Sequence, residues 1–300
     1  MQLHLAQLNV ATLRQPIDHL DTAGFVDGLA PVNALGESSP GFVWRLQDDA
    51  GDATSIRMFE NPLTIPNLTV WENFAALRDF VYRGMHRDFF RKRAMWFEDE
   101  SRTAMWWIPA GTTPTTDDAK ARLNFFDRFG PSPFVFQMGH QFPQLVVVPR
   151  DLDHPDVAPM IAQLNRELTD SKPEGGLTFH SLSADEVADG GAFYVAYLEG
   201  APSACGAYRR IEDTPDAAEV KRMWARPDNR GNKLGASILA TIIQAATDEG
   251  YRELRLETGE YLTAAVGLYT KAGFERCEPW GEYVGSWSSY CMRLSLDVSV

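Results

Sequence analysis

The chain has 300 residues, of which 44% are hydrophobic and 23% charged, as in an ordinary soluble globular protein. This length exceeds the usual span of one hydrophobic core, so we expect two domains. The net charge of -13 disfavours a nucleic-acid-binding protein, because phosphate contacts need a basic face; it suits a cationic small molecule, or serves solubility alone.

Three cysteines, Cys205, Cys277 and Cys291, form no CxxC pair, which favours a reducing cytoplasm over a disulfide scaffold. The first sixteen residues lack the basic region and the long apolar core of a signal peptide. No apolar run approaches the length of a membrane span. We therefore expect a cytoplasmic protein without a membrane partner, and no pattern predicts a metal site.

Residues 1–142 are expected to form the first domain, because loop signals at 112–118 and 130–133 precede a new strand pattern near residue 143. The patterns predict an α+β domain without the regular alternation of a doubly wound sheet. In chain order, we expect strands at 3–11 and 41–47, a strand passing into a helix across 67–84, a strand at 103–110 and a helix at 117–130 that Gly130 ends.

Residues 143–300 are expected to form the second domain, and their patterns are clearer. The middle of this domain reads β–loop–α–β–α. In chain order, we expect a strand, a turn and a helix across 145–168, a hairpin at 191–211 around the turn 199–203, a strand at 218–227 that Pro227 stops, a helix at 233–250, a strand at 251–259, a helix at 262–274 that Gly273 ends, and a strand at 289–296.

The loop RPDNRGNKLGASIL, residues 226–239, gathers cations and glycines in an acidic chain. A helix start offers N–H groups without partners and the positive end of the helix dipole, and Gly231 and Gly235 let an anion approach the backbone. With charge from Arg230 and Lys233, the segment has the chemistry of a phosphate cradle, although it matches neither a P-loop nor a Rossmann fingerprint. A basic turn into an ordinary helix is the alternative.

In this context the second half of the sequence resembles the GNAT superfamily of N-acetyltransferases. RGNKLG (230–235) is similar to that family's acyl-CoA loop, Arg/Gln-x-x-Gly-x-Gly/Ala, except that Lys233 stands where the pattern has glycine and either hinders the ligand or adds charge toward it. LYTKAGF (268–274) is similar to the second family signature, and AEVKRMWARP (218–227) to the central strand. The resemblance implies a GNAT fold over 143–300, with a mixed central sheet flanked by helices, and direct transfer of an acetyl group from acetyl-CoA to an amine.

The resemblance also implies site residues. Tyr269 matches the family's usual general acid, and a phenol with a pKa of about 10 can donate to a departing thiolate. Glu219 occupies the position of the base in histone-type members; it is otherwise a surface carboxylate paired with Lys221, and Glu257 or a chain of waters could take the proton instead. Backbone groups of the central strand would bind the pantetheine arm, so acetyl-CoA is expected at Met223, Trp224, Ala225, Arg230, Gly231, Asn232, Lys233, Leu234, Gly235 and Ala236.

The acceptor is expected to be a small-molecule amine, although a protein amine would satisfy the same chemistry. Tyr283, Trp280 and Trp287 form either an aromatic wall for the acceptor or ordinary packing. The family mechanism needs no acyl-cysteine, so the cysteines are expected to be buried free thiols. A sensor that binds acyl-CoA without turnover is the alternative function, and Tyr269 argues against it.

The first half resembles an uncharacterised bacterial family that is related to dimeric α+β barrels, the group of the antibiotic-biosynthesis monooxygenases. The resemblance implies a ferredoxin-like fold that pairs into a homodimer through its sheet, and a two-enzyme fusion is therefore a further alternative. Asn9, Trp71 and His86 could correspond to the pocket residues of the haem-degrading members, or serve only the structure. The basic run at 86–93 is either a solvated helix face or a contact for an anionic ligand.

Overall fold

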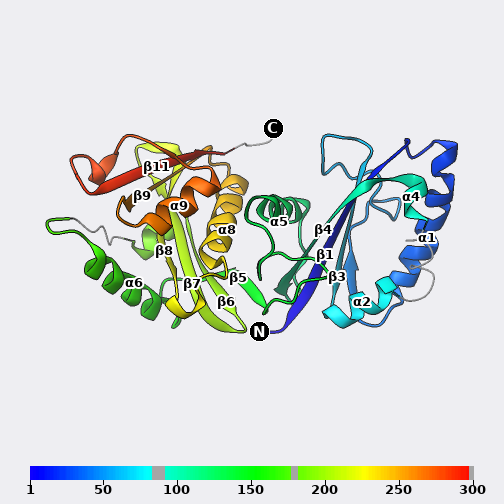
Figure 1. Ribbon diagram of the computed structural model, residues 1–300, viewed down its shortest axis with the longest axis horizontal. Coiled ribbons are helices and arrows are strands. Elements are labelled where there is room, and N and C mark those ends of the chain that lie inside the picture. Colours follow the sequence, from blue (N-terminus) through cyan, green and yellow to red (C-terminus); the bar gives the residue numbers. More distant parts are fainter. Residues whose placement is uncertain (83–91, 177–181, 297–300) are drawn as a thin grey trace. The chain divides into compact units, whose positions relative to one another are not determined.

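The computed structural model describes residues 1–82, 92–176 and 182–296, and the chain divides into two compact units, Met1–Phe142 and Pro143–Val300 (Figure 1). The first unit holds a four-stranded antiparallel sheet in the order β2-β3-β1-β4. Its strands are β1 (Leu3–Leu13), β2 (Phe42–Arg45), β3 (Thr64–Trp71) and β4 (Phe97–Pro109), and its helices are α1 (Ala23–Glu37), α2 (Phe74–Tyr82), α4 (Arg93–Trp96) and α5 (Thr116–Phe129).

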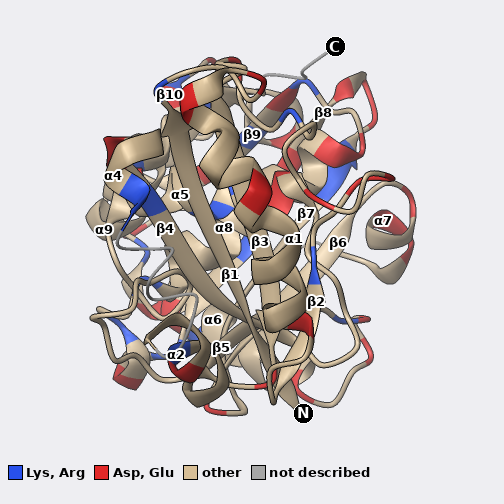
Figure 2. Ribbon diagram, turned by 90° about the vertical axis from the view of Figure 1, so that its right-hand side faces the viewer, with Lys and Arg blue, Asp and Glu red and all other residues tan. Residues whose placement is uncertain are grey.

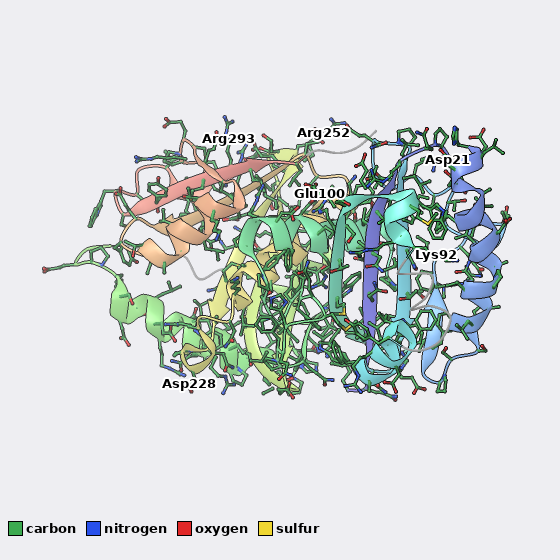
Figure 3. All side chains as sticks on the ribbon, turned by 45° about the vertical axis from the view of Figure 1, so that its right-hand side comes forward. Asp21, Lys92, Glu100, Asp228, Arg252 and Arg293 are labelled. Carbon is green, nitrogen blue, oxygen red and sulfur yellow. The ribbon has the colours of Figure 1, made fainter. Side chains whose placement is uncertain are left out.

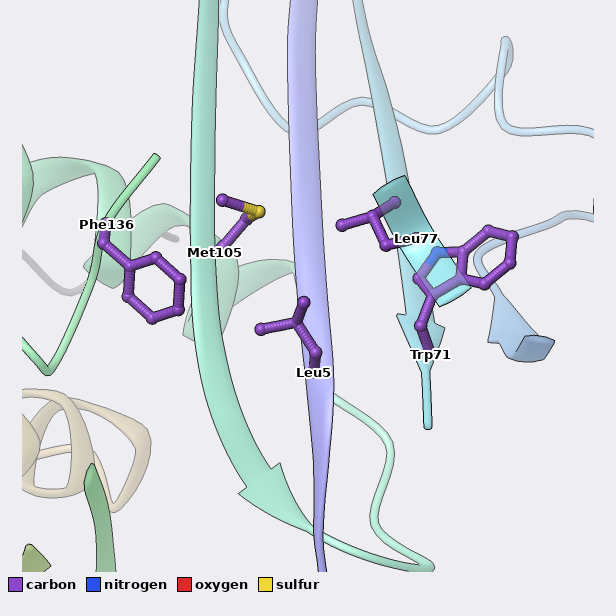
Figure 4. Packing of buried hydrophobic residues seen from close by; sticks show 5 residues of the cluster. All are labelled: Leu5, Trp71, Leu77, Met105 and Phe136. Carbon is purple, nitrogen blue, oxygen red and sulfur yellow. The ribbon is translucent and has the colours of Figure 1, made fainter. Parts of the chain in front are cut away.

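One face of this sheet carries an apolar core against the helices. Leu5 of β1 lies opposite Trp71 of β3. Both are completely buried and pack in one cluster with Leu77 of α2, Met105 and Phe136, which are at most 3% exposed (Figure 4). The Trp71 indole N–H donates to the Thr69 hydroxyl at 2.9 Å, so the polar atom of this large side chain is satisfied inside the core.

The opposite face of the sheet is buried as well. Leu8 and Ala104 are 0% exposed and Trp106 is 1% exposed. The guanidinium of Arg122, on α5, lies 5.8 Å from the centre of the Trp106 ring, so α5 covers part of this face. Helix α5 begins with a capping box between Thr115 and Asp118 and ends at Gly130, as the turn chemistry of these residues favours.

Two departures from expectation occur in the first unit. Helix α1 was not predicted, because Gly24, Gly28, Pro31 and Gly36 lie inside it and such residues usually end helices. The strand β4 begins at Phe97 rather than near 103. Its first half carries exposed charges at 98–100, which hide the apolar alternation of a strand.

The second unit holds a seven-stranded sheet in the order β10-β11-β9-β8-β7-β6-β5. Neighbouring strands are antiparallel except β8 and β9, which are parallel. The strands are β5 (Leu145–Pro149), β6 (Ala192–Leu198), β7 (Ala201–Ile211), β8 (Thr214–Ala225), β9 (Glu253–Gly259), β10 (Glu275–Arg276) and β11 (Ser289–Ser295), and the helices are α6 (Val157–Ser171), α7 (Ala184–Ala188), α8 (Leu234–Asp248) and α9 (Thr263–Ala272).

The hairpin between β6 and β7 is tighter than predicted. Its turn consists of Glu199 and Gly200, both with positive φ, the conformation of a two-residue turn that matches the twist of the strands. Pro202 and Ser203 therefore belong to β7 rather than to the turn. The next strand, β8, begins at Thr214, four residues before the predicted start.

Helix α8 packs against β7 and β8 through an apolar stripe in which Leu234, Ile238 and Ile242 are at most 2% exposed. Helix α9 ends at Gly273, whose φ of 99° is left-handed and suits glycine. In the described parts of the chain, no helix combines the length and the apolar character needed to cross a membrane.

Candidate active site

The two parallel strands at the centre of the second sheet separate after a short pairing. β8 pairs with β9 only through Ala217–Val220 against Glu253–Leu256. Beyond this point β8 bulges, because the register against β7 shifts opposite Gly206, and Arg222 adopts a left-handed φ of 59°. A bulge of this kind bends its strand, so the backbone of β8 leaves β9 and a gap opens inside the sheet.

A pocket of about 130 Å³ occupies this gap. Helices α6 and α9 contribute apolar side chains to its wall, among them Leu164, Leu168 and Ala265. The two strands contribute polar side chains. Its full lining is Leu164, Leu168, Glu219, Val220, Lys221, Arg222, Met223, Glu257, Thr258, Gly259, Tyr261, Leu262, Ala265, Tyr269, Tyr283 and Ser288.

Glu257 and Tyr269 both line this pocket and come from different elements, β9 and α9. Desolvation raises the pKa of the Glu257 carboxyl, while a hydrogen bond from Ser289 and the charge of Lys221 oppose this shift. Desolvation, together with the negative charge of Glu257, also raises the pKa of the Tyr269 phenol. The pocket therefore holds a carboxylate that takes a proton more readily than usual, and a phenol that keeps its own.

Glu219 is 3% exposed, so the alternative that it is a surface carboxylate is wrong. Its Oε2 accepts from Arg209 Nε at 2.8 Å, and its Oε1 accepts from the Tyr283 hydroxyl. Lys221 Nζ lies 3.6 Å from Oε1; the predicted pairing is present, but inside the protein. Both oxygens of Glu219 are thus engaged by this chain's own donors. Arg209 also pairs with Glu186 of α7, a helix with acidic and no basic residues (Figure 2).

The loop after β8 leads into an uncapped helix start. Asp228, labelled in Figure 3, lies in the 3-10 turn Pro227–Asn229, and Gly231 follows with a φ of 91°. Lys233 has a left-handed φ of 59° and provides no side-chain cap for α8. The N–H groups of 234–236 precede the first bond of the helix, from Ser237 N–H to Lys233 C=O at 2.9 Å, so they lack intrahelical partners.

The left-handed backbone at Lys233 explains the glycine of the family pattern, because a residue without Cβ adopts it at no cost. A Cβ built at Gly235 would approach Leu268 of α9 within 3.3 Å. Gly235 therefore serves the close contact of α8 with α9, whereas open space surrounds Gly231, as access to the backbone there requires.

Arg230 is directed away from the helix start. Its Nη2 pairs with Glu167 of α6 at 2.5 Å, and its Nε donates to the Ala225 carbonyl at 3.1 Å. Glu167 also accepts from the Trp224 indole at 3.1 Å. Desolvation by itself would raise the pKa of the Glu167 carboxyl. The hydrogen bonds from Trp224, Arg230 and Gln163 outweigh it and hold this pKa below its usual value. Arg230 thus fixes the loop to the end of β8 and to α6.

The aromatic residues of the acceptor side do not form one wall. Tyr283 is buried in the pocket, and Trp280 packs edge-on against it at 5.2 Å. Trp287 is 70% exposed and does not line the pocket. The cysteines also lie outside it, and burial raises the pKa of the Cys205 thiol to about 12, which makes a thiolate nucleophile unfavourable there.

The three candidates of the first unit are not brought together. Asn9 lines a separate pocket of about 330 Å³ beside α1, whereas Trp71 belongs to the core and lines no part of that pocket. His86, with most of the basic run 86–93, lies outside the described residues.

Arg222 lines the pocket and is 8% exposed, but it was not among the predicted site residues. The signal that could have found it is the pair of adjacent cations, Lys221 and Arg222, between Val220 and Met223 in β8. Alternation places two adjacent residues on opposite faces of a regular strand, so Lys221 and Arg222 are not expected in one pocket, and it is the bulge that brings them together.

Comparison with known proteins identifies two regions. A model of the acetyltransferase (GNAT) family matches residues 160–274, and a model of a domain of unknown function, DUF3291, matches residues 4–150. An "IAA acetyltransferase" of Azospirillum brasilense is 34% identical over 42% of this chain and 82% of its own length. The uncharacterized N-acetyltransferase YedL of Escherichia coli K12 is 32% identical over 44% of this chain and 83% of its own length.

Among solved structures, a GNAT-family acetyltransferase of Staphylococcus aureus Mu50 covers 51% of this chain and 99% of its own, with 13% identity and a TM-score of 0.42. These sequence matches identify the second unit, with its mixed sheet and flanking helices, as an acyltransferase. The chain belongs to the GNAT family of acetyltransferases. The first unit carries a separate domain, and its likeness to the monooxygenase-like group stays a prediction.

Proposed function

We propose that this enzyme transfers an acetyl group from acetyl-CoA directly to the amine of a small molecule. The observation that carries the proposal is the position of Glu257 and Tyr269 on one pocket, at the point where β8 and β9 separate. Direct transfer needs a base for the attacking amine and a proton donor for the leaving thiolate, and these two side chains offer both functions across one small space.

The residues of the second unit fit acetyl-CoA. Gly231 with open space around it, and the uncapped N–H groups of 234–236, offer donors and room for a pyrophosphate. The unpaired edge of β8 at 223–225 offers backbone groups to an extended amide chain. When bound, acetyl-CoA supplies the thioester that is the acetyl donor. Lys233 adds positive charge at the helix start, whereas Arg230 holds the loop through Glu167.

We assign the base to Glu257 rather than to Glu219. Both oxygens of Glu219 already accept hydrogen bonds from side chains of this protein, Arg209 and Tyr283, so an attacking amine would have to compete with these donors. Glu257 has no ion-pair partner within 4.0 Å among the described side chains, and desolvation raises its pKa. It can accept the proton of the attacking amine directly or through one water.

We assign the proton donor to Tyr269. Its phenol is protonated at neutral pH, since the ordinary pKa of a tyrosine is about 10 and desolvation and the charge of Glu257 raise it further. It can therefore stabilise a departing thiolate by donating a hydrogen bond as negative charge develops on sulfur. A sensor that binds acyl-CoA without turnover would need neither Glu257 nor Tyr269 in this arrangement.

The test is release of free thiol from acetyl-CoA by the purified full chain, over a panel of primary amines and amine-bearing peptides. We expect acetylated product, identified by mass, from at least one small amine. Binding of acetyl-CoA, measured as a rise in melting temperature, without thiol release from any amine would favour the sensor. No rise at millimolar acetyl-CoA would overturn the assignment of the donor.

We propose further that residues 1–142 and 143–300 are separate domains and that the first is ferredoxin-like. The order of elements in the first unit, with strand order β2-β3-β1-β4 and α1 and α2 packed on one face, supports the fold. The predicted homodimer through the sheet has less support, because Leu8, Ala104 and Trp106 on the opposite face are already buried in the single chain.

A further inference from the structure

Arg222 is a buried cation without an anionic partner. Its side chain lines the pocket, and the residue is 8% exposed. Nη1 donates to the Asn165 side-chain oxygen at 3.0 Å, and Nε has no hydrogen-bond partner. Among the residues that the structure describes, no carboxylate lies within 4.0 Å of this guanidinium. Buried arginines are normally paired.

The adjacent cation, Lys221, has anionic partners within the protein. Lys221 is also 8% exposed, but its Nζ lies 3.4 Å from Glu282, 3.6 Å from Glu219 and 3.0 Å from the Tyr283 hydroxyl. The charge of Lys221 is thus balanced inside the protein. Arg222 supplies the unbalanced positive charge of the pocket, and Glu257 on β9 supplies a carboxylate that likewise has no ion-pair partner in the described structure.

The backbone that places Arg222 in the pocket is costly. A left-handed φ at a residue with a side chain costs about 1–2 kcal/mol, and the bulge that imposes it requires glycine at 206 on the facing strand. Local strain of this kind persists where the surrounding structure determines it, often at ligand sites. The strain and the unpaired charge occur at the same residue.

We propose that the acceptor carries a carboxylate as well as its amine, as an amino acid does, and that Arg222 binds this carboxylate while the amine faces Glu257. The inference rests on the proposed function. The forked Nε and Nη donors of arginine match the two oxygens of a carboxylate. Arg222 on β8 and Glu257 on β9 carry opposite charges just beyond the point where the two strands stop pairing. This pair is complementary to the carboxylate and the amine of a zwitterion.

The experiment compares Arg222→Asn with wild type and with Arg226→Gln, an exposed arginine four residues along. Asparagine tolerates the left-handed backbone, so Arg222→Asn removes the charge without adding strain, and circular dichroism checks its fold. The acceptors are the twenty amino acids of proteins and their C-terminal amides. Each acceptor is tested with acetyl-CoA as the donor and again with succinyl-CoA as a second donor. Melting temperature with CoA present gives a readout that does not require turnover.

We expect wild type to prefer at least one acid over its amide by tenfold or more in kcat/KM, or to be stabilised by the acid and not by the amide. In Arg222→Asn this preference should fall to about threefold or less, with the KM for acetyl-CoA within twofold of wild type, and Arg226→Gln should keep the preference. Equal response to acids and amides in wild type would overturn the proposal while leaving the acetyltransferase function intact. A changed KM for acetyl-CoA, or loss confined to succinyl-CoA, would assign Arg222 to the donor instead and also overturn it.

Discussion

Replacement of Gly206 by alanine tests whether the bulge in β8 shapes the site. A Cβ at this position would lie 2.4 Å from Met223 Sδ and 2.5 Å from Ile238 Cγ2, about 1 Å inside ordinary contact. Ile238 is completely buried in α8 and cannot move into solvent. Overpacking of a filled core costs about 1–3 kcal/mol, and at about 2 kcal/mol the unit of 143–300 should melt about 4–8 °C lower.

The matched control is Gly267→Ala, a glycine in the exposed middle of α9 with nothing within 4 Å of a built Cβ. Alanine is favoured in a helix interior by about 1 kcal/mol, so this variant should melt about 2–4 °C higher. Calorimetry of the full chain identifies the transition that both variants move. Gly206→Ala should also lose at least tenfold in kcat/KM, because Met223 and Arg222 must shift. An unchanged melting temperature and rate in Gly206→Ala would refute the requirement for glycine opposite the bulge.

The remaining predictions concern the chemistry. Tyr269→Phe should lower kcat about 100-fold or more, the usual contribution of a proton donor, with little change in the affinity for acetyl-CoA by calorimetric titration; equal turnover would dismiss the assignment. In wild type, kcat/KM should rise with pH through the pKa of Glu257, which lies above its usual 4.5, because only the carboxylate accepts a proton. Glu257→Gln should lose this limb of the pH profile and Glu260→Gln, an exposed neighbour, should keep it; a profile unchanged in both would point to Glu219 or water. Lys233→Gly should raise the KM for acetyl-CoA about three- to tenfold at low salt with kcat unchanged, since one positive charge at the start of α8 is lost; a lower KM would mean that Lys233 hinders the ligand.

Much of the second unit could be predicted because its signals are local. Gly273 ends α9 through a left-handed backbone, and the apolar spacing of Leu234, Ile238 and Ile242 marks one face of α8. Such signals depend on residues within a few positions of one another. The order of strand, loop and helix around RGNKLG was therefore readable, and the match to the GNAT family confirms the resemblance.

The arrangement of charges in the site was not readable, because it depends on contacts between distant segments. Glu219 reads as a surface residue until Arg209 and Tyr283, ten and sixty-four residues away, enclose it. Alternation along a regular strand would place Lys221 and Arg222 on opposite faces, and the bulge brings both to one pocket. Helix α1 shows the opposite failure: its glycines and Pro31 argue locally against a helix, and packing of its apolar side chains, such as Phe25, overrides them.

The gap between β8 and β9 leaves two strand edges inside a sheet rather than at its rim. Beyond Val220 and Leu256 the facing edges pair with no strand of the described structure, although β7 and β11 pair with their outer sides. An extended ligand with amide groups can lie along such an edge as a temporary strand. Such binding depends on hydrogen bonds to the main chain of β8 and not on its side chains. Side chains along this edge can therefore be substituted without loss of the ligand. The hydrogen bonding of the sheet would then be complete only with the ligand bound, and amide hydrogen exchange in 221–225 should be slower in the bound protein than in the free protein.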